Sequence, residues 1–176
     1  ARPAHPTSVG AIQTLSFAGV SFQHQSAQFK ALDNISFSVK LGETIAFVGP
    51  SGAGKSTLVK LLVGLYRPQI GHIEYNGAKE NDIDFEELRN QIGFVTQDTQ
   101  LFAGTIRENL SFVFPNATDE EMIVALEKAS CNSILSKAQQ GLESIIGEGG
   151  LKLSGGEKQR LSIARALLRH PHLLIF

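Results

Sequence analysis

A glycine-rich segment in the first third of the chain has the residue types and spacing that hold phosphate. Residues 49–57 read GPSGAGKST and match the pattern G-x-x-x-x-G-K-S/T. Glycines let such a backbone wrap closely, so that successive N–H groups point at one anion. The lysine of this pattern reaches the β- and γ-phosphates of a nucleotide, and the hydroxyl that follows it binds Mg²⁺. We therefore expect a nucleoside triphosphate site built from Gly49, Ser51, Gly52, Ala53, Gly54, Lys55, Ser56 and Thr57.

A second segment, LSGGEKQR at residues 153–160, also has the features of an anion site. Ser154 and Glu157 have the spacing of a capping box, so Ser154 is expected to stand directly before a helix. Gly155 and Gly156 leave the first backbone N–H groups of that helix uncovered, where partial positive charge favours a phosphate. Two phosphate sites in one chain suggest that two chains share each nucleotide, in a head-to-tail dimer with twofold symmetry.

These segments need strands and helices in particular places. The phosphate loop is expected to follow a strand, and the apolar run at residues 44–48 suits one buried on both faces of a parallel sheet. A helix is expected directly after the loop. Its apolar face is formed by Leu58, Leu61, Leu62 and Leu65. The second motif opens a long helix over about residues 154–169, and Pro171 marks its end.

The N-terminal part of the chain has a β-rich pattern. Partial alternation of apolar and polar residues predicts antiparallel strands at residues 12–23 and 31–40. A further short strand is expected at residues 72–77, and a short helix at residues 84–91. This part of the fold is therefore expected to be mostly an antiparallel sheet.

The C-terminal part has a mostly helical pattern between two short strands. The strands are expected at residues 92–97 and 173–176. Residues 105–137 have a helical pattern, in which Thr118 and Glu121 form a capping box. The whole pattern predicts an α/β fold. The resulting domain assignment is a linker at residues 1–11, one domain at residues 12–176, and a helical subdomain at about residues 99–153.

The composition limits the possible partners. The formal net charge is −1, from 16 Lys and Arg against 17 Asp and Glu, so no nucleic-acid partner is expected. Hydrophobic residues make up 42% of the chain, which suffices for a globular core. No apolar run approaches the roughly 18 residues that cross a bilayer. A link to a membrane is therefore expected to come through a partner or through a segment outside these residues.

Taken together, the two motifs resemble those of the nucleotide-binding domain of ATP-binding cassette (ABC) transporters. LSGGE at residues 153–157 resembles the family signature, commonly LSGGQ, with Glu157 in place of glutamine. The segment LFAGTIRENL at residues 101–110 resembles a segment of exporters in particular. The resemblance covers about residues 15–176. It implies a P-loop NTPase (RecA-like) core with an N-terminal antiparallel β subdomain and an α-helical insert.

The resemblance also implies roles for single residues. Gln97 resembles the Q-loop glutamine, whose amide contacts Mg²⁺ and the attacking water; ordinary loop surface is the alternative. His24 stands where exporters usually have a tyrosine that stacks on adenine. The alternative is a surface histidine, with Phe29 as a rival for the base. GEGG at residues 147–150 resembles the loop before the signature, usually GERG, or is a plain flexible loop; Gly149 replaces the arginine.

For function, the resemblance implies binding of ATP with Mg²⁺, which Ser56 and Gln97 would contact. A second nucleotide-binding domain would be a partner in a head-to-tail dimer. Its nucleotide would contact Ser154, Gly155, Gly156 and Glu157. Hydrolysis in the intact domain would power export of a substrate through a transmembrane domain, expected to be fused upstream. The domain would then lie on the cytoplasmic face of a plasma membrane or bacterial inner membrane.

The end of the sequence bears on catalysis. In this family, the strand that LLIF at residues 173–176 resembles ends in an aspartate and a glutamate, the Walker B carboxylates, which steady Mg²⁺ and polarise the attacking water. Neither is present among the 176 residues. We therefore interpret the chain as a partial domain that binds ATP but hydrolyses it very slowly or not at all. Two alternatives remain: a soluble ABC-type ATPase outside transport, and a non-hydrolysing nucleotide-binding module.

Overall fold

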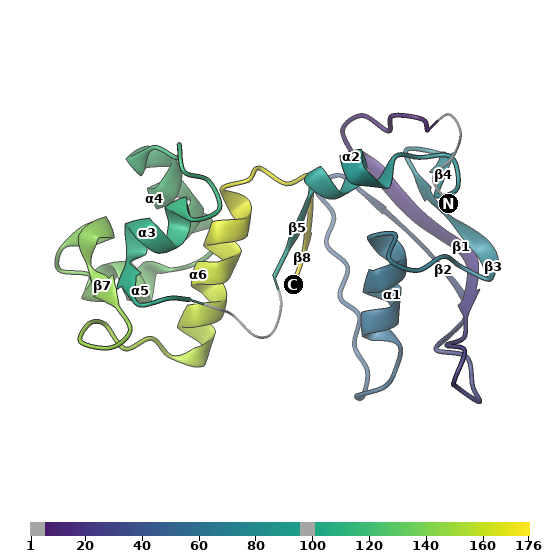
Figure 1. The fold of residues 1–176 in the computed structure, drawn as a ribbon, viewed down its shortest axis with the longest axis horizontal. Helices are drawn as coiled ribbons and strands as arrows, with labels where there is room; N and C mark the ends of the chain where they lie inside the picture. The colour runs from purple at the N-terminus through teal and green to yellow at the C-terminus, as the bar shows by residue number, and fades with distance from the viewer. Residues whose placement is uncertain (1–5, 96–100) are drawn as a thin grey trace. The chain divides into compact units, whose positions relative to one another are not determined.

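The computed structural model of the chain describes residues 6–95 and 101–176. It contains two compact units, Ala1–Gln91 and Ile92–Phe176, which we call the N-terminal and C-terminal units. Figure 1 shows the elements of each unit. Gln97 lies outside the described residues. In the part of the chain that is described, no helix is both long and apolar enough to cross a membrane.

The N-terminal unit is built on an antiparallel sheet. Its strands are β1 Thr14–Phe22, β2 Leu32–Lys40, β3 Ile70–Tyr75 and β4 Ala78–Lys79. They lie in the order β2-β1-β3-β4 (Figure 1). β1 and β2 confirm the antiparallel pair that the sequence pattern predicts. Phe17 lies opposite Phe37 in this pair, and their rings stack with centroids 4.6 Å apart.

Two helices accompany this sheet, α1 Lys55–Leu62 and α2 Phe85–Asn90. The buried face of α1 is formed by Thr57, Leu58, Leu61 and Leu62. The hydroxyl of Tyr75 donates a hydrogen bond to the carbonyl oxygen of Leu62, which joins β3 to the end of α1. Burial raises the pKa of Tyr75 above its usual range, so its hydroxyl keeps the proton that makes this bond.

The apolar face of α1 is shorter than the sequence predicts, because the helix ends at Leu62 and Leu65 is 63% exposed. Gly64 has φ +70°, the left-handed conformation that commonly ends helices. A Cβ atom at this position would also come within 2.2 Å of the ring of Phe85. Both the backbone and the available space therefore require glycine here, and the chain leaves the helical path before Leu65.

Residues 44–48 are not the buried strand that their apolar composition predicts. All of them are exposed, with Phe47 at 43% and Val48 at 95%. Among the described residues, no strand pairs with this segment. Phe47 packs edge-on against Phe37, with ring centroids 5.1 Å apart. An extended segment gains ladder hydrogen bonds only from a neighbouring strand, so apolar composition alone does not make a strand.

The C-terminal unit begins and ends with a pair of parallel strands, β5 Ile92–Phe94 and β8 Leu173–Ile175. They confirm the two short strands predicted at these places. The N–H of Val95 extends the pairing by donating to the carbonyl oxygen of Ile175 at 2.9 Å. The described elements between these strands are β6 Gly104–Thr105, α3 Ile106–Ser111, α4 Asp119–Lys128, α5 Asn132–Lys137, η1 Gly141–Glu143, β7 Ile145–Ile146 and α6 Gly155–Leu167.

The helices of this unit surround one buried apolar cluster. Leu126 of α4, Ile134 of α5 and Leu161 of α6 are all fully buried in it. Burying a leucine or isoleucine side chain stabilises a fold by about 1.5–3 kcal/mol. This cluster, with residues from α3 to α6, is therefore what holds the helical part together.

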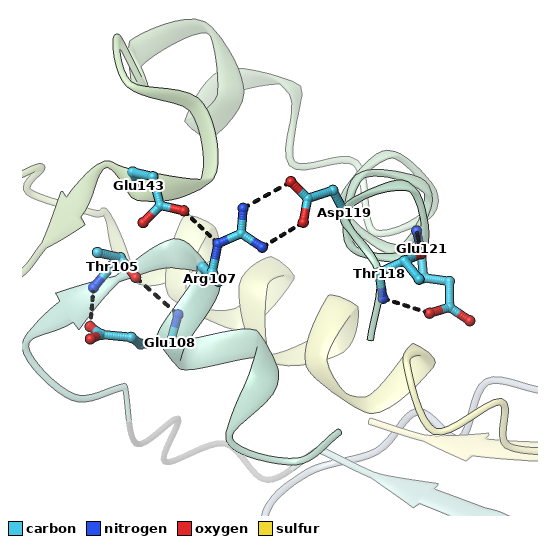
Figure 2. A network of polar contacts seen from close by, with 7 residues as sticks. All are labelled: Thr105, Arg107, Glu108, Thr118, Asp119, Glu121 and Glu143. Atoms are coloured by element: carbon cyan, nitrogen blue, oxygen red, sulfur yellow. Dashed lines mark hydrogen bonds and ion pairs between the residues drawn. The ribbon is translucent and has the colours of Figure 1, made fainter. Parts of the chain in front are cut away.

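Side chains also close the first turns of α3 and α4 (Figure 2). The hydroxyl of Thr118 accepts from the N–H of Glu121 at 3.2 Å, and the carboxylate of Glu121 accepts from the N–H of Thr118 at 2.8 Å. This confirms the capping box predicted at the start of α4. Thr105 and Glu108 form the same arrangement at the start of α3.

Arg107 connects three segments of the C-terminal unit (Figure 2). Its guanidinium donates to both carboxylate oxygens of Asp119, at 2.5 and 2.9 Å, and to Glu143 in η1. The hydrogen bond from Arg107 is the main cause that lowers the pKa of Asp119. Because both carboxylates are well exposed, we assign this network to the orientation of α3, α4 and η1 more than to stability.

We expect Thr118→Ala to destabilise α4 locally, because the N–H of Glu121 loses its side-chain acceptor. Loss of an N-cap hydroxyl costs about 1 kcal/mol. The amides in the first turn of α4 should therefore exchange with solvent faster, as measured by hydrogen–deuterium exchange. Thr118→Ser, which keeps the hydroxyl, is the matched control. Unchanged exchange in Thr118→Ala would show that this cap is dispensable.

Candidate nucleotide-binding site

The phosphate loop depends on glycine at the position before α1. Gly54 is the N-cap of α1 and has φ +88°, in the left-handed region. A Cβ atom at Gly54 would come within 2.2 Å of the carbonyl oxygen of Ala31, at the edge of β2. Glycine also has no side chain with which to cap the first amides of the helix. The sequence thus brings bare backbone N–H groups to the start of α1, the arrangement that binds anions.

Lys55 lies across the same loop. Its ammonium donates to the carbonyl oxygens of Gly49 at 2.6 Å and of Pro50 at 2.8 Å. A phosphate would compete with these neutral acceptors, because it adds attraction between opposite charges to the hydrogen bond. Ser56, the predicted magnesium contact, is exposed, whereas Thr57 is only 8% exposed.

His24, the predicted adenine contact, is half-buried beside the helix that follows the phosphate loop. Its Nε2 atom lies 3.1 Å from the hydroxyl of Thr57. The imidazole packs edge-on against Phe22 and Tyr66, with centroids 5.0 and 5.5 Å away, and those two rings stack on each other. Phe29, the rival for the base, is 81% exposed. Sequence reasoning missed Tyr66 and the contact between His24 and Thr57.

The second motif forms the start of α6, as predicted. Ser154 is the N-cap, and its hydroxyl accepts from the N–H of Glu157 at 3.3 Å. Glu157 Oε2 accepts in return from the N–H of Ser154 at 2.9 Å. A side chain at Gly155 would meet none of the described residues within 4 Å, so this helix start is open to a ligand. Gly156 lies beside the guanidinium of Arg160.

Glu157 makes further contacts that its position in a capping box does not predict. Its side chain is 5% exposed, and Oε1 accepts from the ammonium of Lys137 at 2.8 Å and from the hydroxyl of Ser133 at 3.0 Å. These contacts, with the hydrogen bond from Lys137 as the largest cause, lower the pKa of Glu157 to about 2. Ser133 and Lys137 belong to α5, and no local spacing in the sequence links them to the motif.

The predicted site residues lie in both compact units. The phosphate loop and His24 belong to the N-terminal unit, and the residues at the start of α6 belong to the C-terminal unit. Gln97 is not among the described residues. In the GEGG segment, Gly149 has φ +82°. A residue with a side chain rarely adopts that conformation, so glycine suits the backbone at this position.

A glycine loop that opens a helix without a side-chain cap, and a lysine lying across its carbonyl oxygens, together define a P-loop nucleotide-binding domain. At the capped start of α6, a glycine pair leaves open space at Gly155. Comparison with known proteins gives the family. Residues 32–176 match the family described as ABC transporter, and the chain therefore belongs to the ABC transporter family.

Several relatives with assigned names are similar over most of this chain. The mitochondrial iron-sulfur clusters transporter ATM1 of Kluyveromyces lactis is 44% identical over 92% of this chain, which spans 22% of that protein. The putative multidrug export ATP-binding/permease protein YgaD of Bacillus subtilis is 46% identical over 90% of this chain and 27% of its own length. The β-(1→2)glucan export ATP-binding/permease protein NdvA of Bartonella bacilliformis is 43% identical over 98% of the chain and 28% of its own length.

A solved structure confirms the predicted fold class. A bacterial Atm1-family ABC exporter with ATP bound superposes with a TM-score of 0.79 at 38% identity, over 99% of this chain and 30% of the exporter chain. The mixed α/β architecture with an N-terminal antiparallel sheet is therefore that of an ABC nucleotide-binding domain. Membership of this family implies ATP binding.

The depressed pKa of Glu157 predicts a pH dependence for the stability of the C-terminal unit. The folded-state pKa of about 2 lies below the ordinary value of 4.5, so Glu157 stabilises the fold above pH 4.5. This contribution should be lost as the pH falls from 4.5 to about 2. The difference in urea midpoint between the unsubstituted protein and Glu157→Gln should therefore shrink across that range.

Glu127→Gln, at an exposed position in α4, is the matched control for the loss of a carboxylate. A difference between the unsubstituted protein and Glu157→Gln that stays constant from pH 4.5 down to pH 2 would contradict the assigned ion pair.

Proposed function

We propose that this chain binds ATP with Mg²⁺ and that, in the full-length protein, hydrolysis of this ATP drives export of a substrate across a membrane. The observation that carries the proposal is the phosphate loop, in which the ammonium of Lys55 lies across the loop that leads into the uncapped start of α1. The names of the relatives support export, since they describe a multidrug exporter, a glucan exporter and an iron-sulfur cluster transporter.

In this proposal each residue of the loop has a separate task. The backbone N–H groups of residues 49–57 hold the phosphates, and Lys55 neutralises charge that develops on the γ-phosphate. Ser56 and Gln97 would hold Mg²⁺, and hydroxyl and amide oxygens are the kind of ligand that this ion prefers. When bound, Mg²⁺ would neutralise further phosphate charge, and Gln97 would orient the attacking water.

The start of α6 would contact a nucleotide held by a second nucleotide-binding domain. The γ-phosphate would face Ser154 and the backbone N–H groups of Gly155 and Gly156. Glu157 would lie beside them in the first turn of the same helix. A head-to-tail dimer with twofold symmetry provides this sharing, because each loop then meets the other chain's α6. ATP would thus act as the contact between two domains as well as the substrate.

The other partner would be a transmembrane domain, which we propose to be fused upstream in the same polypeptide. The relatives named as ATP-binding/permease proteins support this arrangement. The chain would then work at the cytoplasmic face of a plasma membrane or bacterial inner membrane. The net charge of −1 gives no support for a nucleic-acid partner.

We expect the polypeptide of residues 1–176 to bind ATP but to hydrolyse it very slowly or not at all. It carries the phosphate loop without the Walker B carboxylates that would polarise water. Lys55→Ala should weaken ATP binding by about tenfold or more, because a charge-assisted hydrogen bond contributes about 1.5–3 kcal/mol. Calorimetric titration with ATP measures the binding, and phosphate release measures the rate.

Lys79→Ala, at an exposed lysine of β4 outside the motif, is the control for the loss of a positive charge. A robust rate of hydrolysis that Lys55→Ala abolishes would contradict the expected low activity. Equal ATP affinity of Lys55→Ala and the unsubstituted polypeptide would contradict the binding site itself.

We also expect His24→Ala to weaken binding of ATP through loss of stacking on adenine, which contributes about 1–3 kcal/mol per base. Binding of tripolyphosphate, which has no base, should not change. His24→Tyr should retain the affinity for ATP, because tyrosine offers a larger stacking surface. Competition with a fluorescent nucleotide measures all these affinities in one assay.

Phe29→Ala is the control, since Phe29 is the rival for the base. If His24→Ala weakens ATP and tripolyphosphate equally, His24 acts through Thr57 and the loop, and the adenine contact is wrong. If only Phe29→Ala weakens ATP, the base stacks on Phe29 instead.

A further inference from the structure

The signature-like segment of this chain contains a charge that its proposed role does not favour. Glu157 stands where the resembled signature has a neutral glutamine, and its carboxylate lies at the helix start proposed to face a phosphate. Two negative groups near each other repel, by an amount that depends on their separation and solvent exposure. A phosphate site at this place therefore needs a positive charge that offsets the carboxylate.

Lys137 provides such a charge from the neighbouring helix. It is the last residue of α5, and its ammonium lies 2.8 Å from Glu157 Oε1. The carboxylate is nearly buried, at 5% exposed, whereas the lysine side chain is 52% exposed. Ser133 donates to the same oxygen at 3.0 Å. Glu157 is therefore held by side chains of α5 on one oxygen and by the backbone of α6 on the other.

The number of donors shows that glutamate and Lys137 fit each other as a pair. The carboxylate accepts from Lys137, from Ser133 and from the N–H of Ser154. A glutamine at this position would offer one acceptor oxygen, so it could not accept from Lys137 and from the N–H of Ser154 at the same time. The contacts around residue 157 thus suit a negative charge and supply the positive charge that balances it.

We propose that Lys137 is a positioning residue of the proposed ATP site in trans, which cancels the charge of Glu157 and holds its carboxylate on the N–H of Ser154. The amides of Gly155 and Gly156 then remain available to an anionic γ-phosphate. This inference rests on the proposed function, because it assigns Lys137 to the phosphate-facing end of α6. Lys137 itself does not touch the nucleotide in this account.

The test is a comparison of variants in the full-length protein. Closure of the two nucleotide-binding domains is followed by energy transfer between labels on them, as a non-hydrolysable ATP analogue is added with Mg²⁺. Lys137→Met should raise the half-saturating concentration of the analogue about two- to fivefold, the usual scale of one charge at a helix end. Lys137→Arg should restore it, because arginine keeps the charge and can donate to the carboxylate.

The matched control is Lys128→Met. Lys128 is an exposed lysine in the last turn of α4, and the described residues show no ion pair for it. The substitution Lys128→Met removes the same charge from the same unit and leaves the contacts of Glu157 in place. Closure of the two nucleotide-binding domains should therefore not change. A loss equal to that of Lys137→Met would show a general effect of net charge and overturn the proposal.

Glu157→Gln provides the decisive background. If Lys137 acts by balancing the charge of the carboxylate, Lys137→Met should raise the half-saturating concentration much less in a protein that already carries Glu157→Gln. If Lys137 contacts phosphate directly, Lys137→Met should raise the half-saturating concentration equally in both backgrounds, and the proposal is wrong. An unchanged half-saturating concentration for Lys137→Met in the unsubstituted background would overturn it as well.

Salt separates a charge effect from a packing effect. The difference between Lys137→Met and the unsubstituted protein should shrink as ionic strength rises, because mobile ions screen the carboxylate that Lys137→Met leaves uncompensated. A difference independent of salt would indicate lost packing between α5 and α6 and would overturn the proposal. Failure of the proposed function would look different: the unsubstituted protein would not close with the analogue, and Lys55→Ala would change nothing.

Discussion

The fold around the nucleotide depends on one constraint, that the first amides of a helix need hydrogen-bond acceptors. In four of the six α-helices that the structure describes, a side chain meets this need, as Asp84 does for α2 and Thr118 for α4, whereas α1 and α5 have no side-chain cap. At α1 the N-cap is Gly54, which brings no acceptor, and the space beside it is filled by the backbone of Ala31. A phosphate bound at this place, as we propose, would accept from these amides.

The same constraint explains which parts of the structure could be predicted from the sequence. A capping box is a local pattern with fixed spacing, so the starts of α4 and α6 were predictable from Thr118 with Glu121 and from Ser154 with Glu157. The alternation in β1 and β2 is equally local, and these strands formed as predicted. The start of α1 directly after the glycine-rich segment was predictable as well, because the glycine spacing and the helical pattern stand in adjacent residues.

What failed depended on neighbours that are distant in the sequence. Residues 44–48 have the composition of a buried strand, but a strand forms only where another lies beside it, and within the described residues none does. Leu65 fits the apolar face of α1, but the left-handed backbone at Gly64 ends the helix first, and Phe85 from another segment leaves no space there for a side chain. The contacts of His24 with Thr57 and Tyr66 were equally invisible, because they join separate segments.

Glu157 shows how a local pattern and a distant contact can act on the same atoms. As the third residue of α6, its carboxylate closes the capping box, which any glutamate or glutamine at this spacing could do. The contacts from Ser133 and Lys137 then tie the start of α6 to α5. A displacement of α5 relative to α6 would break the ion pair between Lys137 and Glu157. The same displacement would leave the negative charge of Glu157 unbalanced at the start of α6. The ion pair between Glu157 and Lys137 therefore both joins these two helices and balances the charge at the proposed phosphate site.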